Sequence, residues 1–193
     1  CVVFFRGCPV KCWYCHNHSI LTGEDRRPIE EIKELIRSSS LLISAVIFSG
    51  GEATMQPSAL LSLAEYSKSI GLLTGLQTNG VYPDVIRRLI DRRLIDHIAL
   101  DIKAEWNLYT VRGKERAVGR QVKESLTLCT RARQAGTLPD FEVVVTLFPG
   151  YGEEVMMISH DVAPGIDLVL QQGVYQGIRP LDLDNLKEIA DQL

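Results

Sequence analysis

The stretch FFRGCPVKCWYCHNHS, residues 4–19, decides how this sequence is interpreted, because three cysteines and two histidines crowd into it. Four kinds of site fit parts of the pattern. CWYC matches a dithiol redox pair, and CWYCH matches the attachment motif of c-type haem. Cys8, Cys12 and Cys15 could bind zinc together with His16 or His18, or they could hold an iron–sulfur cluster. The rest of the chain has to distinguish between these sites.

Composition limits the class of protein. With 193 residues, 46% of them hydrophobic and 23% charged, we expect a single globular domain over residues 1–193. A net charge of -3 gives no basic surface for nucleic acid, and no apolar stretch is long enough to span a membrane. An odd count of five cysteines, three of them in one loop, favours a reducing cytoplasm over a disulfide framework. Because CVVFF already looks like the interior of a strand, we expect the native N-terminus to be truncated.

Short apolar runs alternate with helical patterns along the whole chain. Strands are predicted at 1–5, 44–50, 72–78, 97–103, 141–148 and 167–173, and helices at 28–40, 57–71, 82–93, 118–136, 152–162 and 181–193. This alternation is typical of an α/β protein with a parallel sheet covered by helices. Six units fall short of the eight that close a full barrel, so the prediction is an incomplete (βα)6 barrel or an open sheet.

The motifs that carry chemistry follow successive strands. The cysteine loop comes after the first strand, and SGGE (49–52), QTNG (77–80) and LDIK (100–103) end the next three. Parallel α/β folds place active sites at the carboxyl ends of their strands, so these motifs should share one rim. Taken singly, SGGE could be an ordinary glycine turn and DIK a surface ion pair. Four motifs in register favour a common site.

Position and spacing also separate the candidate metal sites. Haem attachment is typical of small helical exported proteins, and a thioredoxin-like pair leads directly into a helix and does not require Cys8. Structural zinc sites usually draw their ligands from two separated pairs, whereas this set comes from one loop; zinc remains an alternative. Three thiolates in C-x-x-x-C-x-x-C could each bind one iron of a four-iron cluster and leave the fourth iron open for chemistry.

At this point the sequence resembles the radical S-adenosylmethionine (radical SAM) superfamily, whose signature is this cysteine loop with an aromatic residue, here Tyr14, before the third cysteine. The resemblance implies a [4Fe–4S] cluster on Cys8, Cys12 and Cys15. It also implies that S-adenosylmethionine (SAM) chelates the open iron and is cleaved reductively to a 5′-deoxyadenosyl radical.

Further residues are expected around SAM. Gly50 and Gly51 would let the backbone approach its methionine end, and Glu52 could pair with its ammonium. The resemblance places Tyr14 and His16 beside the adenine, and puts at the cofactor the strand-end residues Thr78, Asn79, Asp101 and Lys103. Some related activating enzymes have an acidic residue at the position of Gln77, as part of a cation site; the neutral amide here leaves that cation unassigned.

Within the superfamily, the closest resemblance is to the activating enzymes of glycyl-radical enzymes, and among them to the activator of anaerobic ribonucleoside-triphosphate reductase. CWYCHN, SGGEATMQP, LQTNG and LDIKA carry it, with weaker support from RGK (112–114), VVVTLFPG and LVLQQG. It implies hydrogen abstraction from a glycine of a partner anaerobic ribonucleotide reductase. It also implies a flavodoxin- or ferredoxin-like electron donor.

The remaining chemistry-bearing residues have simpler interpretations. His18, His97 and His160 are expected at the surface or at helix caps, and Cys1 and Cys129 as buried small hydrophobes. Two scattered thiols do not suffice for a second cluster. Two alternatives stay open: a radical SAM enzyme that acts on a small molecule or another peptide, and a zinc-stabilised α/β binding module without catalysis.

Overall fold

The computed structural model describes residues 1–10, 12–23, 26–103 and 118–193, and residues 112–114 of the weaker RGK match lie outside them. Every predicted strand and helix is present. The strands are β1 (Val2–Phe5), β2 (Ala45–Gly50), β3 (Leu73–Thr78), β4 (His97–Ile102), β5 (Asp140–Leu147) and β6 (Asp167–Gln172). The helices are α1 (Ile29–Ser39), α2 (Pro57–Ser69), α3 (Pro83–Asp91), α4 (Val118–Gln134), α5 (Gly152–Asp161) and α6 (Leu183–Ala190), with short 3-10 turns η1 (His18–Ile20) and η2 (Ala53–Met55).

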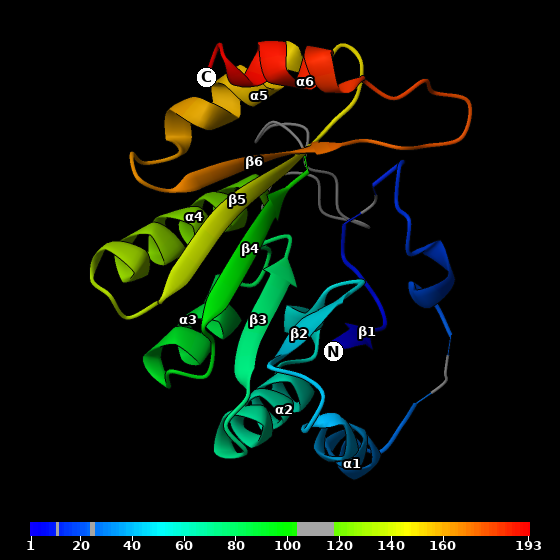
Figure 1. Cartoon of the computed structure of the whole chain (residues 1–193), viewed down its shortest axis with the longest axis vertical. Helices are drawn as coiled ribbons and strands as arrows, with labels where there is room; N and C mark the ends of the chain where they lie inside the picture. Colours follow the sequence, from blue (N-terminus) through cyan, green and yellow to red (C-terminus); the bar gives the residue numbers. More distant parts are fainter. Residues whose placement is uncertain (11, 24–25, 104–117) are drawn as a thin grey trace.

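The six strands form one parallel sheet in the order β1-β2-β3-β4-β5-β6, so each strand lies beside its neighbours in sequence. The sheet curves, and the helices surround its outer face, while the segment after β1 lies on the inner side (Figure 1). β1 and β6 are the two edges and do not pair with one another in the described part of the chain. The predicted incomplete barrel is confirmed.

The alternation of side chains along β5 shows how the sheet is covered. Phe141, Val143, Val145 and Leu147 are buried, whereas the intervening residues are only partly buried. Successive side chains of a strand point to opposite faces, so one face of β5 packs under the helices and the other borders the hollow of the barrel. Burying each of these large apolar side chains contributes roughly 1.5–3 kcal/mol.

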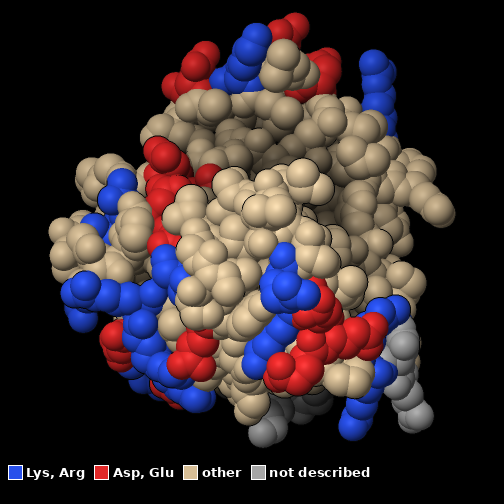
Figure 2. Space-filling view, turned by 60° about the horizontal axis from the view of Figure 1, so that its bottom comes forward, with Lys and Arg blue, Asp and Glu red and all other residues tan. Residues whose placement is uncertain are grey.

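Charged side chains of both signs lie together on the helical surface. Three pairs follow one another in and just before α1: Arg27–Glu31, Lys33–Glu30 and Arg37–Glu34. The face shown in Figure 2 has basic and acidic groups adjoining one another around an uncharged centre. Exposed pairs of this kind contribute little stability, so the core holds the fold together. None of the helices among the described residues has the length and apolarity needed to cross a membrane.

Asp96, just before β4, joins three elements at the amino end of the barrel. Its carboxylate accepts hydrogen bonds from Lys68 of α2 at 2.7 and 2.9 Å. The same carboxylate accepts from the Thr74 backbone N–H at 2.8 Å and from the Thr74 hydroxyl at 3.1 Å. Desolvation alone would raise the pKa of Asp96, but the Lys68 ammonium and the Thr74 donors outweigh it and lower the pKa below its usual value. Asp96 therefore holds α2 and β3 against the start of β4.

We predict that Asp96→Ala lowers the free energy of unfolding by about 1–3 kcal/mol at pH 7, because hydrogen bonds from a charged donor and from a backbone amide are lost. Since the folded pKa of Asp96 is lowered, its stabilising contribution is complete above the unfolded value of about 3.9. That contribution disappears as the pH falls through the folded value. Urea unfolding of both proteins at several pH values measures the difference.

Glu124→Ala is the matched control, because it removes an exposed pair with Arg87. It should cost less than about 1 kcal/mol. An Asp96→Ala cost no larger than that of the control would show that Asp96 does not join these elements energetically.

Candidate active site

A cavity of about 780 Å³ opens at the carboxyl ends of the strands. Every residue that the sequence predicts for the site borders it, which brings together four separate segments. These residues are Cys8, Cys12, Tyr14, Cys15 and His16 from the cysteine loop, Gly50, Gly51 and Glu52 after β2, Thr78 and Asn79 at the end of β3, and Asp101 and Lys103 at the end of β4. The common rim expected from the strand order is therefore present.

Backbone hydrogen bonds fix the cysteine loop to the end of β2. The Gly51 N–H donates to the Phe5 carbonyl and the Glu52 N–H donates to the Gly7 carbonyl, both at 2.8 Å. From the far end of the loop, the Asn17 side chain donates to the Gly50 carbonyl at 3.0 Å. Both ends of the cysteine loop are thus tied to the same turn.

Glycine is required at this turn because the loop backbone lies against it. A Cβ at Gly51 would lie 2.1 Å from the Gly7 carbonyl oxygen, and a Cβ at Gly50 would lie 2.5 Å from the Phe5 backbone. Gly50 also has φ +115°, in the left-handed region that favours glycine. On the side where a Cβ would lie, both glycines contact the chain's own backbone, and they also border the cavity, so their predicted approach to a cofactor stays a prediction. The SGGE turn therefore supports the backbone of the cysteine loop.

The three loop thiols are partly buried around the cavity. Burial raises the pKa of Cys8 to about 12 and that of Cys12 to about 11, so without metal both are neutral thiols. A bound metal ion would have to displace those protons. Among the residues that the structure describes, no three His, Cys, Asp or Glu side chains are grouped as ligands of a single ion.

Glu52 is 1% exposed, and both of its carboxylate oxygens accept hydrogen bonds from within the protein. One oxygen accepts from the Thr54 backbone N–H at 3.1 Å, from the Thr54 hydroxyl and from the Thr78 hydroxyl at 2.7 Å. The other oxygen accepts from the Asn79 backbone N–H at 2.8 Å. Burial raises the pKa of Glu52, while these hydrogen bonds oppose the rise. Glu52 thereby connects the end of β2 to the end of β3.

Asp101 and Lys103 form a close ion pair at the end of β4. Burial alone would lower the pKa of Lys103, but the Asp101 carboxylate outweighs that effect and raises it. The second carboxylate oxygen of Asp101, Oδ1, is buried and accepts no hydrogen bond from the described residues. Tyr14 links the cysteine loop to the end of β4, because its hydroxyl donates to the Lys103 carbonyl at 3.3 Å.

An aromatic group that the sequence analysis missed supports the cysteine loop from the other side. The Trp13 ring lies 4.6 Å from the ring of Phe148 and 5.2 Å from that of Tyr175, and its Nε1 donates to the Tyr151 hydroxyl at 3.2 Å. Trp13 therefore links the loop after β1 to the segments after β5 and β6. Its position inside CWYC was the only sequence signal, because its partners lie more than a hundred residues away.

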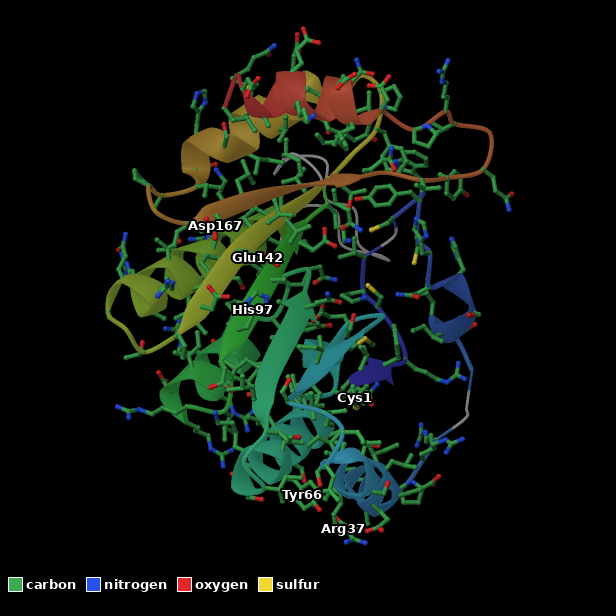
Figure 3. The ribbon with its side chains drawn as sticks, viewed as in Figure 1. Cys1, Arg37, Tyr66, His97, Glu142 and Asp167 are labelled. Carbon is green, nitrogen blue, oxygen red and sulfur yellow. The ribbon has the colours of Figure 1, made fainter. Side chains whose placement is uncertain are left out.

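Other cavity-lining residues come from β5 and β6, including Glu142, Thr146 and Gln171. A charged residue within the apolar run FEVVVTLF was the available signal for an inward-facing position. Glu142 also lies 3.6 Å from Nε2 of His97 (Figure 3). The Nδ1 of His97 lies 2.8 Å from Oδ2 of Asp140. His97 thus takes part in a strand-to-strand contact.

The remaining expectations have mixed outcomes. His18 and His160 are exposed, and Cys129 is completely buried, as predicted. The prediction for Cys1 is wrong: this residue is exposed, because it lies just before the edge strand β1.

Comparison with known proteins identifies the family to which this site corresponds. A family model described as the radical SAM superfamily matches residues 2–161. A protein of Methanocaldococcus jannaschii named as a glycyl-radical enzyme activating enzyme is 37% identical over 126 residues, which cover 65% of this chain and 52% of the relative. A pyruvate formate-lyase-activating enzyme of Clostridium pasteurianum is 32% identical over 112 residues, covering 53% and 44%. The chain therefore spans about half the length of these relatives.

A third relative has a different name. The 7-carboxy-7-deazaguanine synthase of Thermococcus kodakarensis is 30% identical over 124 residues, covering 53% of this chain and 48% of the relative. Among solved structures, Streptococcus suis SuiB bound to S-adenosylmethionine superposes with a TM-score of 0.69 at 17% identity, covering 99% of this chain and 45% of SuiB. At that identity the likeness concerns the fold alone.

We predict that Gly51→Ala prevents iron and sulfide from being incorporated during anaerobic reconstitution. Its Cβ would force the Gly7 backbone aside and displace Cys8, which follows directly. The measurement is iron and sulfide per chain. Gly152→Ala is the matched control, because a Cβ at that position has no neighbour within 4 Å. If Gly51→Ala binds as much iron as wild type, the close contact between Gly51 and Gly7 is not needed to position the cysteine loop.

We also predict that Cys8→Ala, Cys12→Ala and Cys15→Ala each abolish the visible absorption of a reconstituted cluster, because each removes one thiolate ligand. Cys129→Ala should keep that absorption, since Cys129 lies in the core. Loss of the absorption in Cys129→Ala, with retention in a loop variant, would overturn the ligand assignment.

Proposed function

Because this chain belongs to the radical SAM superfamily, we propose that it holds a [4Fe–4S] cluster on Cys8, Cys12 and Cys15 and binds SAM in the adjoining cavity. Members of this superfamily use both groups. The observation that carries the proposal is that three thiols from one loop border the same cavity as the polar ends of β2, β3 and β4.

The residues present suit both groups. A donor set of three thiols from one loop matches a cluster with one iron left open. The buried Oδ1 of Asp101, which accepts nothing from the described residues, offers an acceptor to a hydroxyl or ammonium group of SAM. Zinc would need its ligands grouped around one ion, and the thiols give that alternative no geometric support.

Each segment of the site then has a task. When bound, the cluster and SAM would supply the reductive cleavage chemistry that abstracts a hydrogen atom from a substrate. Lys103 and Asp101 bind polar groups of SAM, and Tyr14 and His16 border its adenine. The rings of Trp13 and Phe148 pack against that of Tyr14 and support its position. Thr78 and Asn79 form the wall behind Cys8.

We further propose that the substrate is a glycine in a partner glycyl-radical enzyme, as the names of the relatives from Methanocaldococcus jannaschii and Clostridium pasteurianum suggest. Abstraction at a glycine Cα leaves a planar radical that the two flanking amides stabilise. The gap between β1 and β6 gives a protein loop room to bring this carbon to near-attack distance, about 3–3.5 Å. The sequence resemblance favours an anaerobic ribonucleotide reductase as the partner, with a flavodoxin- or ferredoxin-like protein as electron donor, in the cytoplasm.

Two observations favour a second candidate, a radical SAM enzyme whose substrate is a small molecule. The relative from Thermococcus kodakarensis is named for such a reaction. In addition, Glu142, Thr146 and Gln171 give β5 and β6 polar groups inside the cavity that could bind a polar small substrate. The two candidates share the cluster and SAM and differ only in what receives the radical.

We predict that the reduced, reconstituted protein, mixed with SAM and the anaerobic ribonucleotide reductase of the same source, produces a glycyl radical on the reductase. Electron paramagnetic resonance detects the radical, and chromatography measures 5′-deoxyadenosine. The matched control replaces the acceptor glycine of the reductase with alanine, which should remove the radical signal. Deoxyadenosine without a protein radical would leave the second candidate as the better proposal.

A further inference from the structure

A side-chain amide lies against one of the proposed cluster ligands. Nδ2 of Asn79 is 3.5 Å from Sγ of Cys8. The orientation of that amide is set by its other end, because Oδ1 accepts a hydrogen bond from the Val81 N–H at 3.2 Å. With the oxygen turned to Val81, the NH₂ group has to face the sulfur.

The amide is held by a buried network. Asn79 is 5% exposed, and its backbone N–H donates to Oε2 of Glu52 at 2.8 Å. The next residue, Gly80, donates from its N–H to the Thr78 hydroxyl at 3.1 Å and accepts from the Ser125 hydroxyl at 2.6 Å. Because the backbone of Asn79 and that of Gly80 are both held by hydrogen bonds, the NH₂ group already faces the sulfur before a cluster binds.

We propose that Asn79 tunes the cluster by donating a hydrogen bond to the Cys8 thiolate, an inference that rests on the proposed cluster. Hydrogen bonds to ligand sulfurs are among the factors that set the potential of an iron–sulfur cluster. A one-electron reduction adds negative charge that the cluster shares with its sulfurs. The donor stabilises the reduced form more than the oxidised form, so Asn79 raises the reduction potential. Glu52 is a positioning residue that acts through the backbone of Asn79.

The test compares Asn79→Ala and Asn79→Asp with wild type by redox titration of the reconstituted proteins without SAM. Dithionite supplies the electron, and electron paramagnetic resonance follows the reduced cluster. Asn79→Ala should decrease the equilibrium constant for reduction about tenfold, because a hydrogen bond to a charged group is lost. For one electron this is a shift of about 59 mV toward more negative potential. Asn79→Asp keeps the bond from Val81 but turns a carboxylate to the sulfur, and should shift the potential further.

Ser125→Ala is the matched control for a merely structural effect, because it removes the bond to the Gly80 carbonyl and leaves the amide at Cys8. It should lower stability and keep the wild-type potential. The proposal is overturned if both Asn79 variants titrate as wild type does, or if Ser125→Ala shifts the potential as far as Asn79→Ala. It is also wrong as stated if neither Asn79 variant assembles a cluster while Ser125→Ala does. A wild-type chain that assembles no cluster would instead refute the proposed function.

Discussion

The close approach of the cysteine loop to the turn after β2 is the constraint on which the rest of the site depends. Gly7 and Gly51 meet backbone to backbone, so the position of Cys8 is set by a contact that allows no side chain at residue 51. Two hydrogen bonds of 2.8 Å fix the register of that contact. β3 and β4 follow β2 in the same parallel sheet, so their carboxyl ends lie next to the loop and form further walls of the cavity.

The incomplete sheet has a consequence for the loop. A closed barrel would give the segment after β1 neighbours on both sides, whereas here the other edge strand, β6, does not pair with β1 in the described part of the chain. Trp13 makes up for part of that missing contact by reaching Tyr151 and Tyr175. Trp13 is 44% exposed, so it supports the loop from the surface of the protein.

Periodicity predicted the sheet, and the parallel order then predicted the site, because the carboxyl ends of parallel strands share an edge. The placement of Cys8, Asn79 and Asp101 around one cavity follows from that rule alone. The role of Gly51 could not be predicted, since the clash with Gly7 depends on how two distant segments dock. The pairing of Glu52 with the ammonium of SAM stays a prediction, because Glu52 borders the cavity. Only the tertiary structure reveals that donors from Thr54, Thr78 and Asn79 occupy its oxygens.

A buried carboxylate such as Glu52 is costly unless hydrogen bonds replace its water, and four of them do so here. Apolar packing could have joined β2 to β3 without that cost. A carboxylate also makes directional hydrogen bonds. The bond from the Asn79 N–H fixes the backbone of Asn79, and thereby the position of its side-chain amide at Cys8. The opposite wall differs, because β6 has mostly exposed or half-buried residues. A buried hydrogen-bond network therefore lies behind Cys8, whereas the wall formed by β6 is more exposed.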